Sequence, residues 1–383
     1  MKSIKTTPVL VIVSFLSFVF AGCKQKEYFK GDLNSFTCVE DTCFIKGKVL
    51  QIDSLHFDYF GVCDSLALFY SPMRNDFAYE VYNVNTGKKV GNFCPLGHGG
   101  DEFVSISPIT QIFKEGDDSK TILFMPNESK LIKWNITQSA IHKKTCYEDI
   151  AVHTWRKESP VAYSKVFKVG SDSILTYFSS VHISGKEIVT PQKYTIRTFS
   201  DNKKLDEIST FSAAENRDDI KVLPENFFSL LSCIKPDGSK LVEALVFLPQ
   251  INIVNIKTKG VTGFLMTGYD DYTLFDSDMS DARLYYIDVQ ATNDYIFALW
   301  KGNSYFDDNA LCESDILHVY DWDGNMKKVI KLDHCVSRMF FDDTSRHLFC
   351  SHMDRTELYC YDILRMMEYV NKEGSKHVDE VGV

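Results

Sequence analysis

The residues with the clearest chemical potential lie in one short glycine-rich stretch, residues 97–103. This stretch places two carboxylates, Asp101 and Glu102, directly after a pair of glycines. Adjacent carboxylates on a tight turn can hold Mg²⁺ beside the triphosphate of a nucleotide. A run of glycines can equally serve only to let the backbone turn sharply. The surrounding elements decide between these two interpretations.

The five residues from Gly99 to Phe103 resemble the signature of the diguanylate cyclases. That chemistry needs alternating helices and strands around the motif, whereas helical periodicity is nearly absent from this sequence. We therefore predict a linking loop, in which Glu102 caps neighbouring backbone amides and Phe103 packs between two structural units. The residues assigned to this loop are Gly97, Gly99, Gly100, Glu102 and Phe103. No catalytic residue is predicted.

An aspartate-rich segment is the only feature that suggests a cofactor. Asp276 and Asp278 are spaced as Ca²⁺ ligands can be, with Asp270, Asp271 and Asp281 nearby. The EF-hand pattern is absent, because the sixth position counted from Asp276 is Asp281 and not glycine. Solvated loop carboxylates are the simpler interpretation, so Ca²⁺ remains an open alternative.

Aromatic residues are concentrated in the same part of the chain, at Tyr269, Tyr272, Tyr285, Tyr286 and Trp300. Aromatic rings beside carboxylates suit the face of a sugar. Packing between strands explains most of these rings more simply. Motifs for a zinc protease, a serine hydrolase or a P-loop are absent from the sequence.

One unit recurs along the chain: an apolar strand, a turn of Asn, Asp, Thr, Lys or Gly, and a returning strand. The turns fall near residues 86, 138, 202, 258, 324 and 363. Intervals of roughly 40–65 residues are typical of propeller blades with insertions, each blade being a four-stranded antiparallel sheet. A single blade cannot bury both of its apolar faces, but a ring of blades can. The sequence therefore predicts an all-β, six-bladed β-propeller.

The last blade, from about residue 336, shows three clear strands that end at Asp362. Its missing outer strand could come from the N-terminal segment 43–52 or from residues 366–370. We favour the N-terminal segment, which would tie the two ends of the chain together and leave no open blade.

The first residues have the pattern of an export signal. Lys2 and Lys5 precede a short apolar run, residues 9–20, which is too short for a comfortable membrane span. Small residues follow and lead directly to Cys23. This arrangement resembles the lipobox of bacterial lipoproteins, although Phe20 stands where that family usually has Leu. An ordinary cleaved signal with an incidental cysteine is the alternative.

The resemblance implies a division of the chain into four segments. Residues 1–22 would be the signal peptide, and residues 23–35 a lipidated Cys23 with a polar tether. Residues 36–370 would form the propeller, and residues 371–383 a polar tail. It also implies an address in the cell envelope, as an outer-membrane lipoprotein on the periplasmic or the surface face, held at the membrane by its lipid. We expect a monomer.

The amino-acid composition restricts the classes of partner that the protein can bind. The formal net charge is −10, and 44% of the residues are hydrophobic. An acidic chain of this kind argues against binding to nucleic acid, which needs a basic face. Eleven cysteines permit disulfides outside the cytoplasm, and buried free thiols are an equally good interpretation.

Taken together, these marks resemble the six-bladed β-propeller lipoproteins of Bacteroidota, a TolB-like propeller family. The marks are the Asn85-Thr-Gly87 turn, the loop 97–103 and the late turn 320–324, in that order behind a lipobox. The resemblance covers about residues 36–365 and implies fold and address more than activity.

Three functions follow as expectations. The first is a lipid-anchored scaffold that binds a protein, peptide or glycan at its channel mouth or loop face. The second is a hydrolase or lactonase with a metal in the central channel, held by Glu, Asn and Asp side chains from several blades. The third is an assembly partner of a membrane complex. We favour the binding scaffold.

Overall fold

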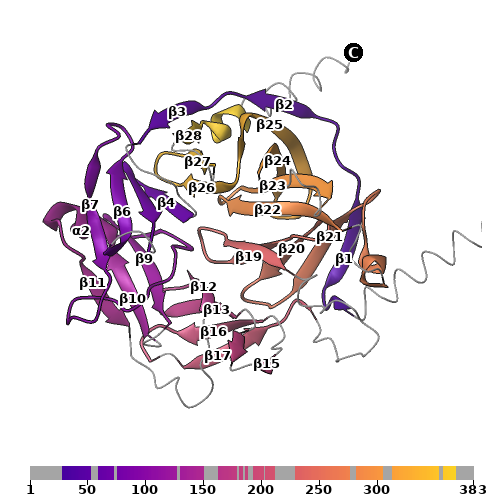
Figure 1. Ribbon diagram of the computed structural model, residues 1–383. Coiled ribbons are helices and arrows are strands. Elements are labelled where there is room, and N and C mark those ends of the chain that lie inside the picture. The colour runs from indigo at the N-terminus through magenta and orange to yellow at the C-terminus, as the bar shows by residue number, and fades with distance from the viewer. Residues whose placement is uncertain are drawn as a thin grey trace, which may run out of the picture.

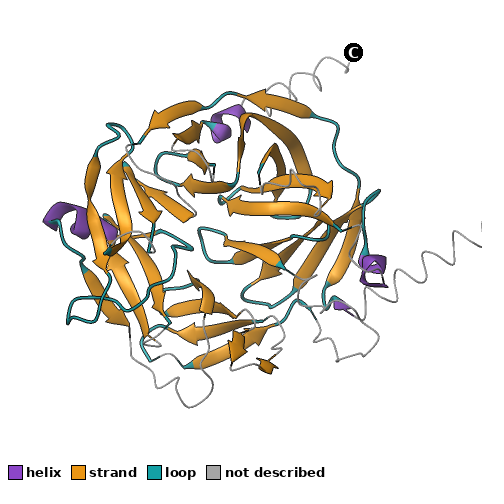
Figure 2. Cartoon of the chain, in the orientation of Figure 1, coloured by secondary structure: helices purple, strands orange, loops and turns teal. Residues whose placement is uncertain are grey.

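Strands make up almost all of the regular structure in the computed structural model of the protein (Figure 2). The structure describes residues 28–52, 59–72, 76–126, 130–150, 163–178, 181–183, 186–188, 193–201, 203–211, 229–276, 282–304, 313–352 and 357–367. Within them, helix is confined to short pieces such as α2 (Ile136–His142) and the 3₁₀ turn η2 (Tyr272–Asp276). No helix of the described part is long and apolar enough to cross a membrane.

Six four-stranded antiparallel units follow one another around a central axis (Figure 1). Blade 1 consists of β4 (Tyr59–Cys63), β5 (Leu66–Tyr70), β6 (Phe77–Asn83) and β7 (Lys89–Pro95). Blade 2 consists of β8 (Phe113–Glu115), β9 (Asp118–Met125), β10 (Lys130–Asn135) and β11 (Tyr147–Ile150). Blade 3 consists of β12 (Tyr163–Lys168), β13 (Ser173–Phe178), β16 (Tyr194–Thr198) and β17 (Lys204–Ile208), with the hairpin β14 (Val181–Ile183) and β15 (Lys186–Ile188) between its second and third strands.

The second half of the ring has the same organisation. Blade 4 consists of β18 (Leu230–Ile234), β19 (Lys240–Leu245), β20 (Gln250–Asn255) and β21 (Val261–Met266). Blade 5 consists of β22 (Arg283–Ala291), β23 (Tyr295–Ser304), β24 (Ser314–Asp321) and β25 (Met326–Val336). Blade 6 consists of β26 (Arg338–Asp342), β27 (His347–Ser351), β28 (Glu357–Tyr361) and β3 (Lys48–Gln51). The predicted six-bladed propeller is confirmed.

In blades 1, 4 and 5 the recurring turn connects the third and fourth strands, and a polar side chain of each turn accepts hydrogen bonds from nearby backbone amides. In blade 1 the Asn83 Oδ1 accepts from the amides of residues 85 and 86, and in blade 4 the Asn255 Oδ1 accepts from the Thr258 amide. In blade 5 the Asp321 carboxylate accepts from the amides of residues 323 and 325. A short acceptor side chain at this place satisfies backbone donors that the ladder leaves free.

Two of the predicted turns are helical instead. Residue 138 lies in α2, because the Asn135 side chain caps the first turn by accepting from the Gln138 amide. Residues 363–367 also form a helical turn, with Met367 buried. The alternative outer strand at residues 366–370 is therefore wrong for its first two residues, and residues 368–370 lie outside the described part.

The N-terminal segment 28–51, here called the strap, runs along the rim of blades 4, 5 and 6 (Figure 1). Its strand β1 (Asp32–Phe36) pairs parallel with β21, and β2 (Thr42–Ile45) pairs parallel with β25. Its last strand, β3, pairs antiparallel with β28 and completes blade 6. Closure of the ring by the N-terminal segment is confirmed, but the predicted single strand is two strands in two different blades.

The predicted tether 23–35 is wrong for the part that the structure describes. Tyr28 and Phe29 are buried, and Phe29 forms a bridge to Phe211. Strand β1 already begins at Asp32. Apolar residues inside the polar segment explain the difference, since Phe29 and Leu33 pack into a cluster between blades 3 and 4. Among the described residues, contacts with the propeller body are therefore present from residue 28 onward, before the predicted start at residue 36.

Aromatic side chains fill the spaces between neighbouring blades. The Tyr79 ring of blade 1 lies 4.9 Å from the Trp134 ring of blade 2, and the Phe60 ring of blade 1 lies 6.3 Å from the Phe340 ring of blade 6. The ring is therefore closed by packing near its axis as well as by β3 at its rim. The nine described cysteines are free thiols, which favours the packing interpretation for these residues.

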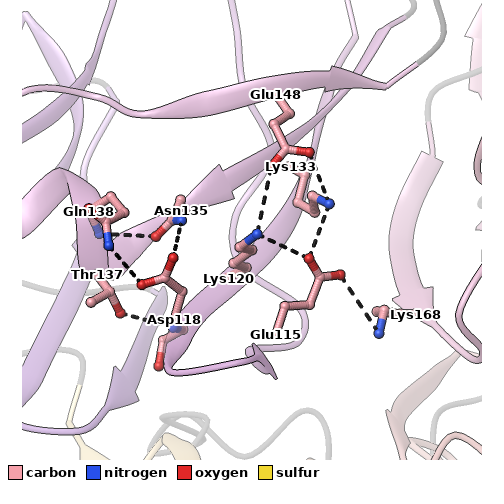
Figure 3. Close-up of polar contacts among 10 residues, drawn as sticks. Glu115, Asp118, Lys120, Lys133, Asn135, Thr137, Gln138, Glu148 and Lys168 are labelled. Carbon is pink, nitrogen blue, oxygen red and sulfur yellow. Dashed lines mark hydrogen bonds and ion pairs between the residues drawn. The ribbon is translucent and has the colours of Figure 1, made fainter.

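An ion network joins blade 2 to blade 3 (Figure 3). The Glu115 carboxylate lies 3.1 Å from the Nζ atoms of both Lys120 and Lys133, and Glu148 contacts the same two lysines from β11. Lys168 of blade 3 reaches Glu115 at 3.9 Å. Burial would raise the pKa of Glu115, but hydrogen bonds from Lys120 and Lys133 outweigh it and lower that pKa. Every cation of this network therefore has a counter-ion.

Candidate functional site: the central channel

The innermost strands of the blades enclose two adjacent cavities near the ring axis, which together we call the channel. The wide cavity has a volume of about 460 Å³ and is lined by residues drawn from 110–114, 168–170, 233–238, 290–291 and 340–343. The narrow cavity has a volume of about 270 Å³ and is lined by residues of β4, β12, β18, β22 and β26 and by residues 108–110. Thr110, Gln290 and Phe340 line both cavities, so the two lie next to each other. Ligand pockets in proteins commonly have volumes of about 300–1,000 Å³; the wide cavity lies within this range and the narrow cavity just below it.

The narrow cavity holds two cations and one carboxylate, each from a different blade. The Lys165 Nζ donates to the Ser232 carbonyl oxygen at 3.1 Å. The Arg338 guanidinium donates to the carbonyl oxygens of Ile287 and Ser337, both at 3.3 Å. Asp288 is the carboxylate between them in sequence and lines the same cavity.

Burial dominates the electrostatics of these groups. It lowers the pKa of Lys165 to about 8, with the negative charge of Asp288 as the largest opposing influence. It raises the pKa of Asp288, against the charge of Arg338 and a hydrogen bond from the Met339 amide. A charged side chain in the narrow cavity is therefore destabilised unless it has a counter-ion or hydrogen-bond partner.

The wide cavity differs, because its lysines are paired. Lys114 lies 2.7 Å from the Asp64 carboxylate, and Lys168 belongs to the network of Glu115. At the same end, burial and the neighbouring Asp342 raise the pKa of Asp343 to about 6. The two ends of the channel therefore have different chemistry.

Lys165→Met is expected to raise the free energy of unfolding at about pH 7 by roughly 1 kcal/mol. The expected gain is small because the Lys165 side chain is only partly buried, so that solvent reduces the cost of its charge. The folded protein binds the Lys165 proton less tightly than the unfolded chain does. Stability of the wild type should therefore rise as the pH increases from about 8 toward the ordinary lysine pKa of about 10.4, and the advantage of the variant should shrink. Urea unfolding at both ends of this window measures the difference. Lys130→Met, which removes a cation paired with Asp149, should show no gain.

The predicted linking loop lies away from the channel, between the outer strands of blades 1 and 2. Glu102 Oε2 accepts a hydrogen bond from the Gly99 amide at 2.8 Å, and a Cβ atom at Gly97 would meet the same oxygen. Phe103 is buried, bridges to Leu96 and packs edge-on against the Tyr147 ring at 5.2 Å. Gly100 has open space around it. The carboxylate of Glu102 is thus directed at its own loop.

The remaining predicted sites do not come together in the described residues. Tyr272, Tyr285 and Tyr286 are buried in the core, and of the predicted aromatic group Tyr269 alone is well exposed. Asp270 accepts from the Tyr285 hydroxyl, while Asp278, Asp281 and Cys23 lie outside the described part. Among the described residues, no group of three or more His, Cys, Asp or Glu side chains is placed to hold a metal ion. The set of metal ligands expected for a lactonase-like channel is therefore not present among the described residues.

Sequence reasoning missed Lys165, Asp288 and Arg338. Each is a charged residue beside aromatic or aliphatic residues on the innermost strand of a blade. A charged residue with such neighbours in a strand that should be buried was the available signal. The signal was ambiguous, because each strand holds a second charged residue: Lys168, Arg283 or Asp342.

Comparison with known proteins agrees with this architecture. A family model described as a TolB-like, six-blade propeller matches residues 252–344, from β20 of blade 4 into blade 6. The resemblance to TolB-like propellers is confirmed, and the chain is a six-bladed β-propeller. The comparison with curated proteins gave no significant match.

Solved structures of similar shape have very different sequences. A DUF4221-family member from Bacteroides vulgatus has a TM-score of 0.49 and 10% identity, covering 82% of this chain and 97% of its own. A candidate exported protein from Bacteroides fragilis has a TM-score of 0.48 and 10% identity, covering 86% and 98%. A gluconolactonase from Xanthomonas campestris has a TM-score of 0.43 and 7% identity, covering 82% and 89%. Likeness at this level does not extend to function.

Proposed function

We propose that the protein is a lipid-anchored binding protein of the cell envelope that takes a ligand into its central channel. The observation that carries the proposal is the channel itself, two adjacent cavities lined by residues from all six blades. Binding sites are concave, with mostly apolar walls and a few placed polar groups, and the narrow cavity has this composition.

The N-terminal sequence supports the envelope address. A charged start, a short apolar run and small residues before Cys23 suit an exported lipoprotein. The buried Tyr28 is only the fifth residue after Cys23, a distance that extended chain can span over at most about 17 Å. A lipid on Cys23 would therefore hold the rim of the propeller close to the outer membrane. Intact mass measurement of detergent-extracted protein should show the acyl chains, and Cys23→Ser should lose both the added mass and the membrane fraction.

A plugged channel tests the binding function. Gln290→Trp places a large ring where the two cavities meet, whereas Ile141→Trp changes an exposed position on α2. We would screen amino acids, short peptides and neutral and acidic sugars by thermal shift. At least one class should raise the Tm of the wild type and of Ile141→Trp, but not that of Gln290→Trp. A shift that persists in the plugged variant, or a screen without any shift, would count against channel binding.

A further inference from the structure

Two cations in the narrow cavity, Lys165 and Arg338, form no ion pair with any residue that the structure describes. Among the described residues, the hydrogen-bond acceptors of Lys165 and Arg338 are neutral carbonyl oxygens, and neither side chain takes part in an ion pair. Charged groups removed from bulk water are normally paired, because an unpaired charge loses its hydration without compensation. Two such groups in one cavity therefore require an explanation.

The carboxylate that lines the same cavity, Asp288, acts on both cations through its charge but forms no ion pair with either. Asp288 Oδ1 accepts from the Val289 amide at 2.8 Å, and Oδ2 accepts from the Met339 amide at 2.6 Å. Both oxygens are thus used by the backbone of β22 and β26. Two cations and one anion leave the cavity with a formal charge of +1, in a protein whose net charge is −10.

The contrast with the wide cavity shows that pairing is the rule elsewhere in the channel. Lys114 and Lys168 both contact carboxylates there, Asp64 and Glu115 respectively. Within the channel, cations that form no ion pair are therefore a feature of the narrow cavity and not of the wide one.

The walls beside the two cations are apolar and aromatic. The Arg338 guanidinium lies 5.1 Å from the centroid of the Tyr59 ring, and this ring is 43% exposed. Phe60, Leu230 and Met339 complete this side. A volume of about 270 Å³ accommodates one amino-acid residue or one sugar ring.

We propose that the narrow cavity binds the carboxylate of its ligand between Lys165 and Arg338, with the adjoining part of the ligand against Tyr59. The inference rests on the proposed binding function of the channel and specifies the ligand's chemistry. Guanidinium and carboxylate match in geometry and charge, and Lys165 adds a second charged donor. The carboxylate could belong to a peptide terminus or to a uronic acid, which share this group.

Paired probes that differ only in the carboxylate test the inference. Isothermal titration would compare N-acetylphenylalanine with its amide, and glucuronate with glucose, on the full mature chain. In at least one pair the acid should bind at least tenfold more tightly than the neutral partner, and that pair identifies the source. Arg338→Gln and Lys165→Met should each weaken the acid at least tenfold, while Lys130→Met, outside the channel, should stay within twofold. Retention of the circular dichroism spectrum establishes that the variants fold.

The alternative outcomes separate this inference from the proposed function. Equal binding of acid and neutral probe, abolished by Gln290→Trp, would overturn the carboxylate site and keep the channel as a binding site. Inorganic phosphate that binds as tightly as the acids would also overturn it, in favour of a general anion site. Failure of all acids to bind would overturn the inference, and the wider thermal-shift screen would then decide the proposed function.

Discussion

Gly47→Val is expected to lower the free energy of unfolding by about 3 kcal/mol or more, because it drives a side chain into a filled space. A Cβ atom at Gly47 would lie 2.6 Å from the Tyr361 ring. Gly47 is also the point where the strap passes from blade 5 to blade 6. Its amide donates to Asp333 Oδ1 at 3.1 Å, and the Tyr361 hydroxyl donates to the same oxygen at 3.0 Å.

The expected loss exceeds that of an ordinary overpacked site because β3 follows directly. A displacement of Gly47 would move β3 out of its pairing with β28. The edge of β28 would then lack its outer neighbour in blade 6. Gly100→Val is the matched control, since Gly100 has open space around it. Urea unfolding of the two variants measures the difference. Equal stability of Gly47→Val and the wild type would show that the strap does not close the ring.

Glu243→Ala is expected to cost about 3 kcal/mol of unfolding free energy, because it leaves buried donors without an acceptor. Glu243 is fully buried on β19, where Oε1 accepts from the Thr210 hydroxyl and Oε2 from the Asn252 amide at 2.9 Å each. Gln250 and Tyr272 extend this network. The Thr210 carbonyl accepts from the Lys30 amide, so the same network holds the start of the strap.

Glu243→Gln separates hydrogen bonding from charge. Its amide group can accept from Asn252 and donate to the Thr210 hydroxyl, so the loss should stay within about 1 kcal/mol. Burial raises the pKa of Glu243, although hydrogen bonds from Asn252 and Thr210 oppose the shift. The folded state therefore binds the proton more tightly, and this contribution to stability is full at acid pH and lost as the pH rises above the ordinary carboxyl range. Relative to Glu243→Gln, the wild type should lose stability across that rise; a flat difference would contradict a buried carboxylate.

The repeated turns allowed the blade number to be predicted, because Asn83, Asn255 and Asp321 end strands by local hydrogen bonds that leave a mark in the sequence. The parallel pairing of β1 and β2 left no comparable mark. Their residues alternate only weakly between polar and apolar, and their partners lie more than two hundred residues away. Pairing over such distances depends on the closed ring and not on local pattern.

The candidate site was beyond prediction for a related reason. Lys165, Asp288 and Arg338 lie on blades 3, 5 and 6, and each strand holds a second charged residue, so no single strand marks its charged residue as part of a site. Ring closure brings them to one cavity. The glycine-rich loop, by contrast, was conspicuous because its residues are adjacent in sequence, and that adjacency reflects a local turn in which Glu102 accepts from the Gly99 amide.

The most direct test of the channel as an anion-binding site is the titration of Lys165 followed by nuclear magnetic resonance of isotope-labelled lysine, with Lys165→Met to assign its signal. In the free protein Lys165 should titrate with a pKa of about 8. Addition of the acid probe should raise that pKa, because a bound carboxylate favours the charged amine, and the neutral probe should not. A Lys165 that titrates in the ordinary range near 10.4 and does not respond to either probe would contradict the proposed site.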